Sequence, residues 1–107
     1  MTAPNEIIHQ QHRLRIMAAL EHAGEALDFA MLKKISKATD GNLGAHLRTL
    51  ENAGYIEVSK EAIGGRVRTW VALTGAGRLA FREHVSFLED ILASSMISSA
   101  TEKKGNL

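Results

Sequence analysis

The sequence contains no cysteine, and it lacks any long apolar run. Without cysteine the chain has neither a disulfide framework nor a thiolate metal site. No apolar stretch approaches the ~20 residues that a membrane helix needs, and no basic segment followed by an apolar run marks a signal peptide. Phosphate-loop and nucleophile-elbow motifs are also missing. We therefore expect a cytoplasmic protein that is not an enzyme and has no cofactor and no membrane association.

The length and the charge distribution indicate one small domain with a basic middle. At 107 residues, 45% hydrophobic and 23% charged, the chain is typical of a single globular domain with a modest core. Residues 33–82 hold nine cations and four anions, a net charge of +5, whereas the flanks together carry −4. This pattern suits a protein that presents one face to a polyanion, although solvated charges can also fall unevenly by chance. We predict a domain over residues 1–93 and a flexible C-terminal tail over residues 94–107.

The segment from Thr39 to Ile56 predicts an amphipathic helix over about 40–53. Leucines at 43, 47 and 50 recur at helical spacing, Thr39 or Asp40 can cap the start, and Gly54 ends the helix. The opposite face carries small or hydrogen-bonding side chains and one cation, which suits the reading of base edges in a major groove. A solvated outer face is the alternative. The candidate face consists of Asn42, Ala45, His46, Arg48, Thr49 and Asn52.

Two further helices and a short strand are predicted before this segment. The first helix runs from Glu6 to about Ala23, and Glu25–Leu27 is long enough only for an edge strand. Asp28 is expected to cap a helix from Phe29 to about Lys37, with its lysines facing outward as candidates for phosphate contact. Two short helices joined by a brief turn form a helix-turn-helix, of which the second helix enters the DNA groove. The outward lysines are Lys33, Lys34 and Lys37.

After Gly54 the hydrophobic period changes from 3.6 to 2. Two alternating runs, from Ile56 to Glu61 and from Arg66 to Leu73, flank a turn that contains Gly64 and Gly65. This pattern predicts a β-hairpin that projects as a wing. We expect Arg66 and Arg68, close to its tip, to contact phosphates or an adjacent minor groove. Their alternative role is to solvate a hairpin edge and to discourage aggregation.

The last predicted helix, capped by Thr74, runs from about Gly75 to Ala93 or a little beyond. Its apolar stripe is wider than a terminal helix needs to cover its own core, so we expect a dimer interface formed with the first helix. A broad intramolecular packing face is the alternative. The predicted interface residues are Ile7, Ile8, Phe81, Val85, Leu88 and Leu92.

Four histidines are the possible ligands for a metal or for a pH response. His9 and His12 lie one helical turn apart, but a zinc site needs three or four converging ligands. We therefore expect ordinary surface or interface histidines and no metal site; the other two are His22 and His84.

The order helix–helix–helix–hairpin–helix resembles the winged-helix DNA-binding domains of bacterial and archaeal transcriptional regulators, in particular the small MarR-like and ArsR-like group. The matching motifs are His12–Leu20, Asp40–Ile56 and Arg68–Ala80. The resemblance implies an α+β, mostly helical winged helix-turn-helix with a C-terminal dimerisation helix. It also implies a homodimer that binds double-stranded DNA at a pseudo-palindromic operator.

The same resemblance assigns the junction into the last helix to Thr74, Gly77 and Arg78, near a phosphate. Metal-sensing relatives use cysteines, which this chain lacks, so a small-molecule effector is left open. Two alternatives also stay open: a winged helix that docks a partner protein without specific DNA binding, and a histidine-based metal- or pH-responsive regulator. The arginines of the wing favour DNA, because a pure interaction module has no need of them.

Overall fold

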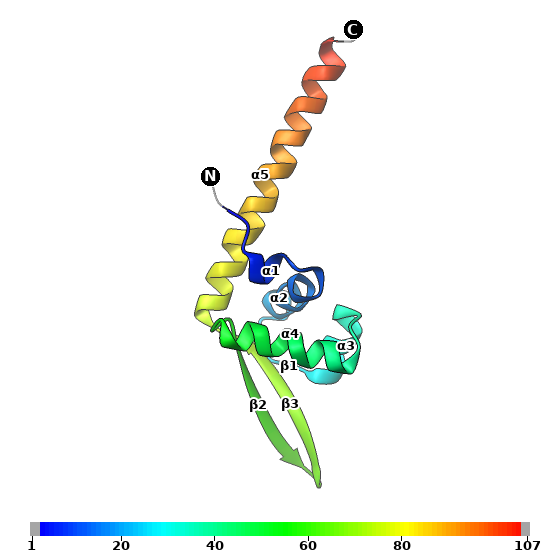
Figure 1. Ribbon diagram of the computed structural model, residues 1–107, viewed down its shortest axis with the longest axis vertical. Coiled ribbons are helices and arrows are strands. Elements are labelled where there is room, and N and C mark those ends of the chain that lie inside the picture. Colours follow the sequence, from blue (N-terminus) through cyan, green and yellow to red (C-terminus); the bar gives the residue numbers. More distant parts are fainter. Residues whose placement is uncertain (1–2, 106–107) are drawn as a thin grey trace.

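The described part of the chain folds into five helices and a small antiparallel sheet. The computed structural model describes residues 3–105, with side-chain surroundings up to residue 95. The fold is α+β and mostly helical, as predicted (Figure 1). In chain order the elements are α1 (Glu6–His9), α2 (Gln11–Ala23), β1 (Leu27–Asp28), α3 (Phe29–Ser36), α4 (Asp40–Asn52), β2 (Ile56–Ile63), β3 (Arg66–Leu73) and α5 (Gly75–Gly105).

The N-terminal segment forms two helices, so the prediction of one helix from Glu6 to Ala23 is wrong. Gln10 has an extended backbone (φ −64°, ψ 132°), and its side chain accepts hydrogen bonds from the N–H groups of His12 and Arg13. Gln10 thus ends α1 and caps α2. Glutamine is not among the preferred N-cap residues, so the sequence carries no signal for this break.

The helix-turn-helix forms where the capping residues predict it. The carboxylate of Asp28 accepts from Met31 N at 2.9 Å at the start of α3, and the hydroxyl of Thr39 accepts from Asn42 N at 3.3 Å at the start of α4. Lys37 ends α3 in the left-handed conformation (φ 59°). The two helices are further joined by an ion pair between Lys33 and Asp40.

The hairpin is longer than predicted and stands out from the body of the domain. β2 continues to Ile63, which pairs with Arg66 across the two-residue turn Gly64–Gly65, whose φ angles of 55° and 79° favour glycine. The short β1 pairs with β3 only at Leu27↔Val71 and Asp28↔Trp70. The outer half of the hairpin therefore projects beyond β1 (Figure 1).

The core lies between α1–α4 and the inner half of the sheet. Ile8 has no exposed surface (0%), so it cannot contact a second subunit and its prediction as a dimer-interface residue is wrong. Ile7 is partly buried against the same core. The break at Gln10 turns α1 back against α2, which explains why Ile8 faces inward. The buried apolar residues are Ile8, Ile16, Met17, Leu20, Leu32, Ala38, Leu43, Leu47, Leu50, Ile56 and Val71.

The junction into α5 is built around Thr74. Its hydroxyl donates to Gly54 O at 2.7 Å and accepts from Gly77 N at 2.9 Å, and its N–H donates to Tyr55 O at 3.0 Å. This capping confirms Thr74 as the start signal of the last helix.

The helix α5 continues to Gly105, so the prediction that it ends near Ala93 is wrong. After Gly77 the sequence contains no glycine or proline before Gly105, and serine is tolerated inside a helix. The helix leaves the body on the side opposite the hairpin, which gives the molecule extents of 69 × 24 × 22 Å (Figure 1). The predicted tail is thus helical up to residue 105, and residues 106 and 107 lie outside the described part. None of the helices in residues 3–105 is long and apolar enough to cross a membrane.

Candidate nucleic-acid interface

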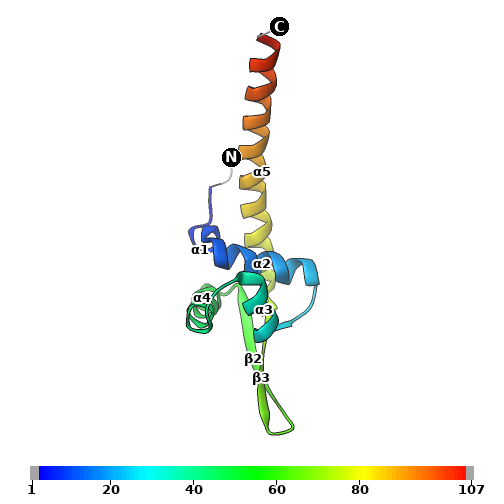
Figure 2. The same ribbon diagram turned by 90° about the vertical axis from the view of Figure 1, so that its right-hand side faces the viewer.

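The helix α4 lies on the outside of the domain and exposes one polar face. Figure 2 views it nearly along its axis, beside the hairpin and outside the other helices. Its leucines are buried, whereas Asn42, Ala45 and Arg48 are exposed. The Thr49 hydroxyl donates to Ala45 O at 3.1 Å, which leaves its methyl group and a free lone pair for a partner. This face combines a cation, an amide and small side chains, which can approach base edges closely.

His46 lies on the flank of α4 that faces α2, away from Ala45 and Arg48. It is half-buried, and its Nδ1 lies 3.1 Å from Nη1 of Arg13. The ring of His12 lies 5.4 Å away, centroid to centroid. Burial, then the Arg13 charge and then His12 lower the pKa of His46 below its usual value, so the neutral ring is favoured.

The two faces of the hairpin carry different cations. Arg66 and Arg68 share one face with Trp70, as the alternation predicts. Lys60 pairs with Thr69 on the other face, the same side as the buried Val71. Sequence reasoning missed Lys60 as a candidate site residue, although its position two residues after Val58 places it on the inward face.

A groove of about 270 Å³ separates α4 from the inner face of the hairpin. Arg48 and Glu51 line it from α4, and Lys60 lines it from β2. Two cations from two elements thus line one hollow, and one anion, Glu51, lines it as well. The remaining lining residues are Phe29, Gly44, Leu47, Val58 and Thr69.

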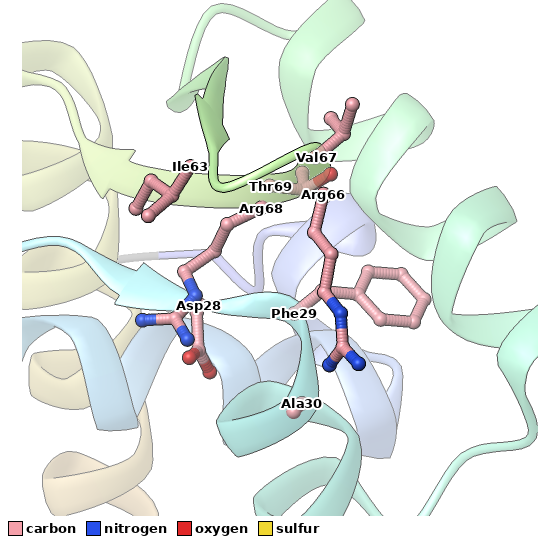
Figure 3. Close-up of a pocket in the computed structure, with 8 residues that line it drawn as sticks. All are labelled: Asp28, Phe29, Ala30, Ile63, Arg66, Val67, Arg68 and Thr69. Carbon is pink, nitrogen blue, oxygen red and sulfur yellow. The ribbon is translucent and has the colours of Figure 1, made fainter.

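The two wing arginines line a second hollow of about 550 Å³ beside the start of α3. Figure 3 shows both side chains reaching from β3 toward the junction of β1 and α3, where Asp28 and Phe29 lie. The guanidinium carbon of Arg68 lies 5.8 Å from the centre of the Trp70 ring, and Trp70 Nε1 donates to Glu61 Oε2 at 3.0 Å. Arg68 is therefore held by a cation–π contact with Trp70, whereas Arg66 lies next to the turn at the exposed tip.

Two other predicted contact residues differ in their surroundings. Lys37 is exposed in the turn between α3 and α4. Arg78, which the resemblance places near a phosphate, lies 3.7 Å from Glu21 Oε1, and Arg82 approaches the same oxygen at 3.3 Å. Arg78 thus links α5 to α2, and its charge is partly neutralised there.

The burial of the apolar stripe of α5 decreases along the helix. Phe81 packs partly against the core of its own domain, and Val85 and Leu88 are half-buried. Ile91 and Leu92, farther along, are exposed. The outer part of the stripe therefore has no cover among the described residues.

The histidines do not assemble a metal site among the described residues. His9 Nδ1 lies 3.3 Å from His84 Nε2, but no third histidine or carboxylate joins them in the described part of the chain. His84 is buried between α1 and α5, and its Nδ1 accepts a hydrogen bond from Asn5 N at 3.1 Å. The pair packs α1 against α5.

Comparisons with known proteins agree with this geometry. The pattern of the winged helix DNA-binding domain family matches residues 12–92. The chain is 39% identical over 80 residues to an uncharacterized protein of Methanocaldococcus jannaschii, covering 75% of this chain and 86% of that protein. A transcriptional regulator homologue from Pyrococcus horikoshii is 30% identical with a TM-score of 0.75, covering 84% of this chain and 88% of that one.

A more distant structure shares the fold alone. The S. aureus MepR–DNA complex is 18% identical with a TM-score of 0.68, covering 92% of this chain and 79% of that one. Another solved structure with this fold is that of a transcriptional regulator of the MarR family. The family pattern covers most of the chain, and the structure contains the helix-turn-helix and the wing that define this family. The chain therefore belongs to the winged-helix DNA-binding domain family and has the MarR-like fold of transcriptional regulators.

Proposed function

We propose that the protein is a sequence-specific DNA-binding transcriptional regulator that acts as a homodimer on a pseudo-palindromic operator. The observation that carries this proposal is the outer face of α4, exposed beside a hairpin with cations on both of its faces. A helix with small and hydrogen-bonding side chains fits the major groove, whereas flanking cations bind phosphates irrespective of sequence. The chromosome is then the place of action.

Each element has a distinct role in this docking. Arg48 contacts a guanine edge or a phosphate, and Asn42 lies in the first turn of α4, where free N–H groups also favour phosphate. Lys60 faces Arg48 across the groove between α4 and β2, so the two cations can bracket one DNA strand. Arg66 at the wing tip reaches the backbone or the adjacent minor groove.

The proposed homodimer uses the outer part of α5. At 31 residues this helix is about 46 Å long, far longer than its contact with its own domain requires. Exposed apolar side chains such as Ile91 and Leu92 would be covered by the same surface of a second copy. Two recognition helices must then lie roughly 34 Å apart to read half-sites one DNA turn apart. A structural neighbour, S. aureus MepR, was solved in complex with DNA, which supports DNA binding by this fold.

The test is fluorescence anisotropy of a random-sequence duplex of roughly 30 base pairs, titrated with protein at several salt concentrations. We expect tight binding at low salt that weakens steeply as salt rises, because each neutralised phosphate releases counterions. Selection from a random library should then enrich a pseudo-palindrome. Absence of binding at low salt would overturn the proposal and favour the alternative of a protein-interaction module.

A further inference from the structure

One polar contact links the recognition helix to the N-terminal helices. Arg13 of α2 donates from Nε to the carbonyl oxygen of Ile7 in α1, and its Nη1 lies 3.1 Å from His46 Nδ1 in α4. A guanidinium group can only donate hydrogen bonds, so Nδ1 of His46 must be the unprotonated acceptor. One side chain thus joins three helices.

We propose that Arg13 is a positioning residue for DNA recognition, which fixes the rotation of α4 through its hydrogen bond to neutral His46. This inference rests on the proposed function and adds a residue outside the DNA-facing surface to it. His46 and Arg48 lie about 160° apart around the helix at 100° per residue, on opposite flanks of the buried leucines. A contact that holds His46 against α2 fixes the rotation of α4 about its axis. It therefore also fixes the direction in which Arg48 points. Misplacing recognition side chains by a fraction of an ångström weakens binding.

The surroundings of His46 make the contact depend on its protonation. The titratable groups that face its ring are Arg13 and His12, both from α2. Among the other elements packed against α4, α3 contributes Lys33, which is paired with Asp40, and α1 contributes the Ile7 carbonyl. Lys60 of β2 lies across the groove on the Arg48 side. In the described part of the chain the charged and protonatable groups that act on the His46 ring are Arg13 and His12, so a proton on the ring would repel Arg13 and break the hydrogen bond.

This role and a direct contact between His46 and DNA predict opposite responses to pH. If His46 touched a phosphate, protonation would strengthen binding by adding a positive charge. If His46 positions α4 through Arg13, protonation removes the contact and weakens binding. His46→Asn separates the two, because its side-chain oxygen can occupy the place of Nδ1 and accept from Arg13 but does not titrate.

The first measurement is the Kd of wild type and of His46→Asn for one duplex enriched from the random library, between about pH 7.5 and pH 5. The ratio of the two values removes the contribution of the other histidines, which both proteins share. We expect the wild-type Kd to rise relative to that of His46→Asn as the pH falls, by roughly fivefold to tenfold, the change that corresponds to the net loss of one typical hydrogen bond. A ratio that stays constant or moves in the opposite direction would overturn the inference. His22→Asn, which replaces an exposed histidine of α2, is the matched control and should keep the wild-type profile.

The second measurement needs no DNA. Titration of the histidine ring protons by NMR gives the pKa of His46 in wild type and in Arg13→Met. We expect the pKa of His46 to rise in the variant, and Arg13→Lys, which keeps the charge, to restore most of the lowering. An unchanged pKa of His46 in a folded Arg13→Met protein would show that the contact does not exist, and the inference would then be wrong. If no protein binds DNA at any pH, the proposed function fails and the positioning role with it, whereas the NMR titration still reports whether the contact exists.

Discussion

The first turn of α5 lies so close to the start of β2 that a Cβ atom on Gly77 would overlap the backbone carbonyl of Tyr55. Thr74 holds the two segments together, because its N–H donates to the same carbonyl oxygen at 3.0 Å. This contact fixes where the long helix leaves the winged-helix body.

Gly77→Ala should therefore lower the free energy of unfolding by about 3 kcal/mol, because backbone atoms cannot move aside as a flexible side chain can. Urea denaturation measures this change. Gly75→Ala is the matched control, since it lies in the same turn with open space around a Cβ. It should be neutral or stabilising by up to about 1 kcal/mol. Equal stability of the two variants would show that the close approach at Tyr55 does not exist.

Leu92→Asp should shift the protein from dimer to monomer without unfolding it, because it places a charge in the proposed α5 interface. Sedimentation velocity over a range of concentrations measures the shift. Leu79→Asp is the control: both leucines are 61% exposed, but Leu79 lies about 140° away from Leu92 around the same helix. A dimer that survives Leu92→Asp, or that dissociates equally in Leu79→Asp, would place the interface elsewhere.

The stability of the domain should fall in mild acid through His84. Burial and then His9 lower its pKa from about 6.5, with Glu6 opposing them in part. Because the folded pKa is lower than the unfolded one, the unfolded chain binds more protons between the two values. The stabilisation is therefore complete above about pH 6.5 and is lost as the pH falls through the folded pKa.

The matched variant for this effect is His84→Asn, whose side-chain oxygen can still accept from the N–H of Asn5 but cannot bind a proton. Urea unfolding at about pH 7.5 and pH 5.5, at one protein concentration, compares the two proteins. Wild type should lose more stability than the variant on acidification. The same loss in both would assign the acid sensitivity to other groups.

In the wing, Lys60→Ala and Arg66→Ala should each weaken DNA binding for all sequences alike and reduce the salt slope by about one unit. Anisotropy titrations at several salt concentrations give both quantities. Arg82→Ala removes the same charge from α5, where it pairs with Glu21, and should leave the slope unchanged. A change of sequence preference with little loss of general affinity would show that Lys60 or Arg66 contacts bases instead of phosphates.

The features that could be predicted are those encoded within a few residues. The leucine spacing and Thr39 define α4, Asp28 defines the start of α3, and the change of period around Gly64–Gly65 defines the wing. Each depends on a helical face, a capping hydrogen bond or a backbone conformation that does not need the rest of the chain. The order of these elements was therefore enough to indicate the family.

Which side of each element is covered depends on the tertiary structure. Gln10 breaks the first helix and turns Ile8 into the core, a change for which no local signal exists. The helical period predicts His46 on the outer face of α4 with Arg48, yet the position of α2 places it against Arg13. Burial and hydrogen bonding depend on what packs against a residue, and the helix period alone does not contain that information.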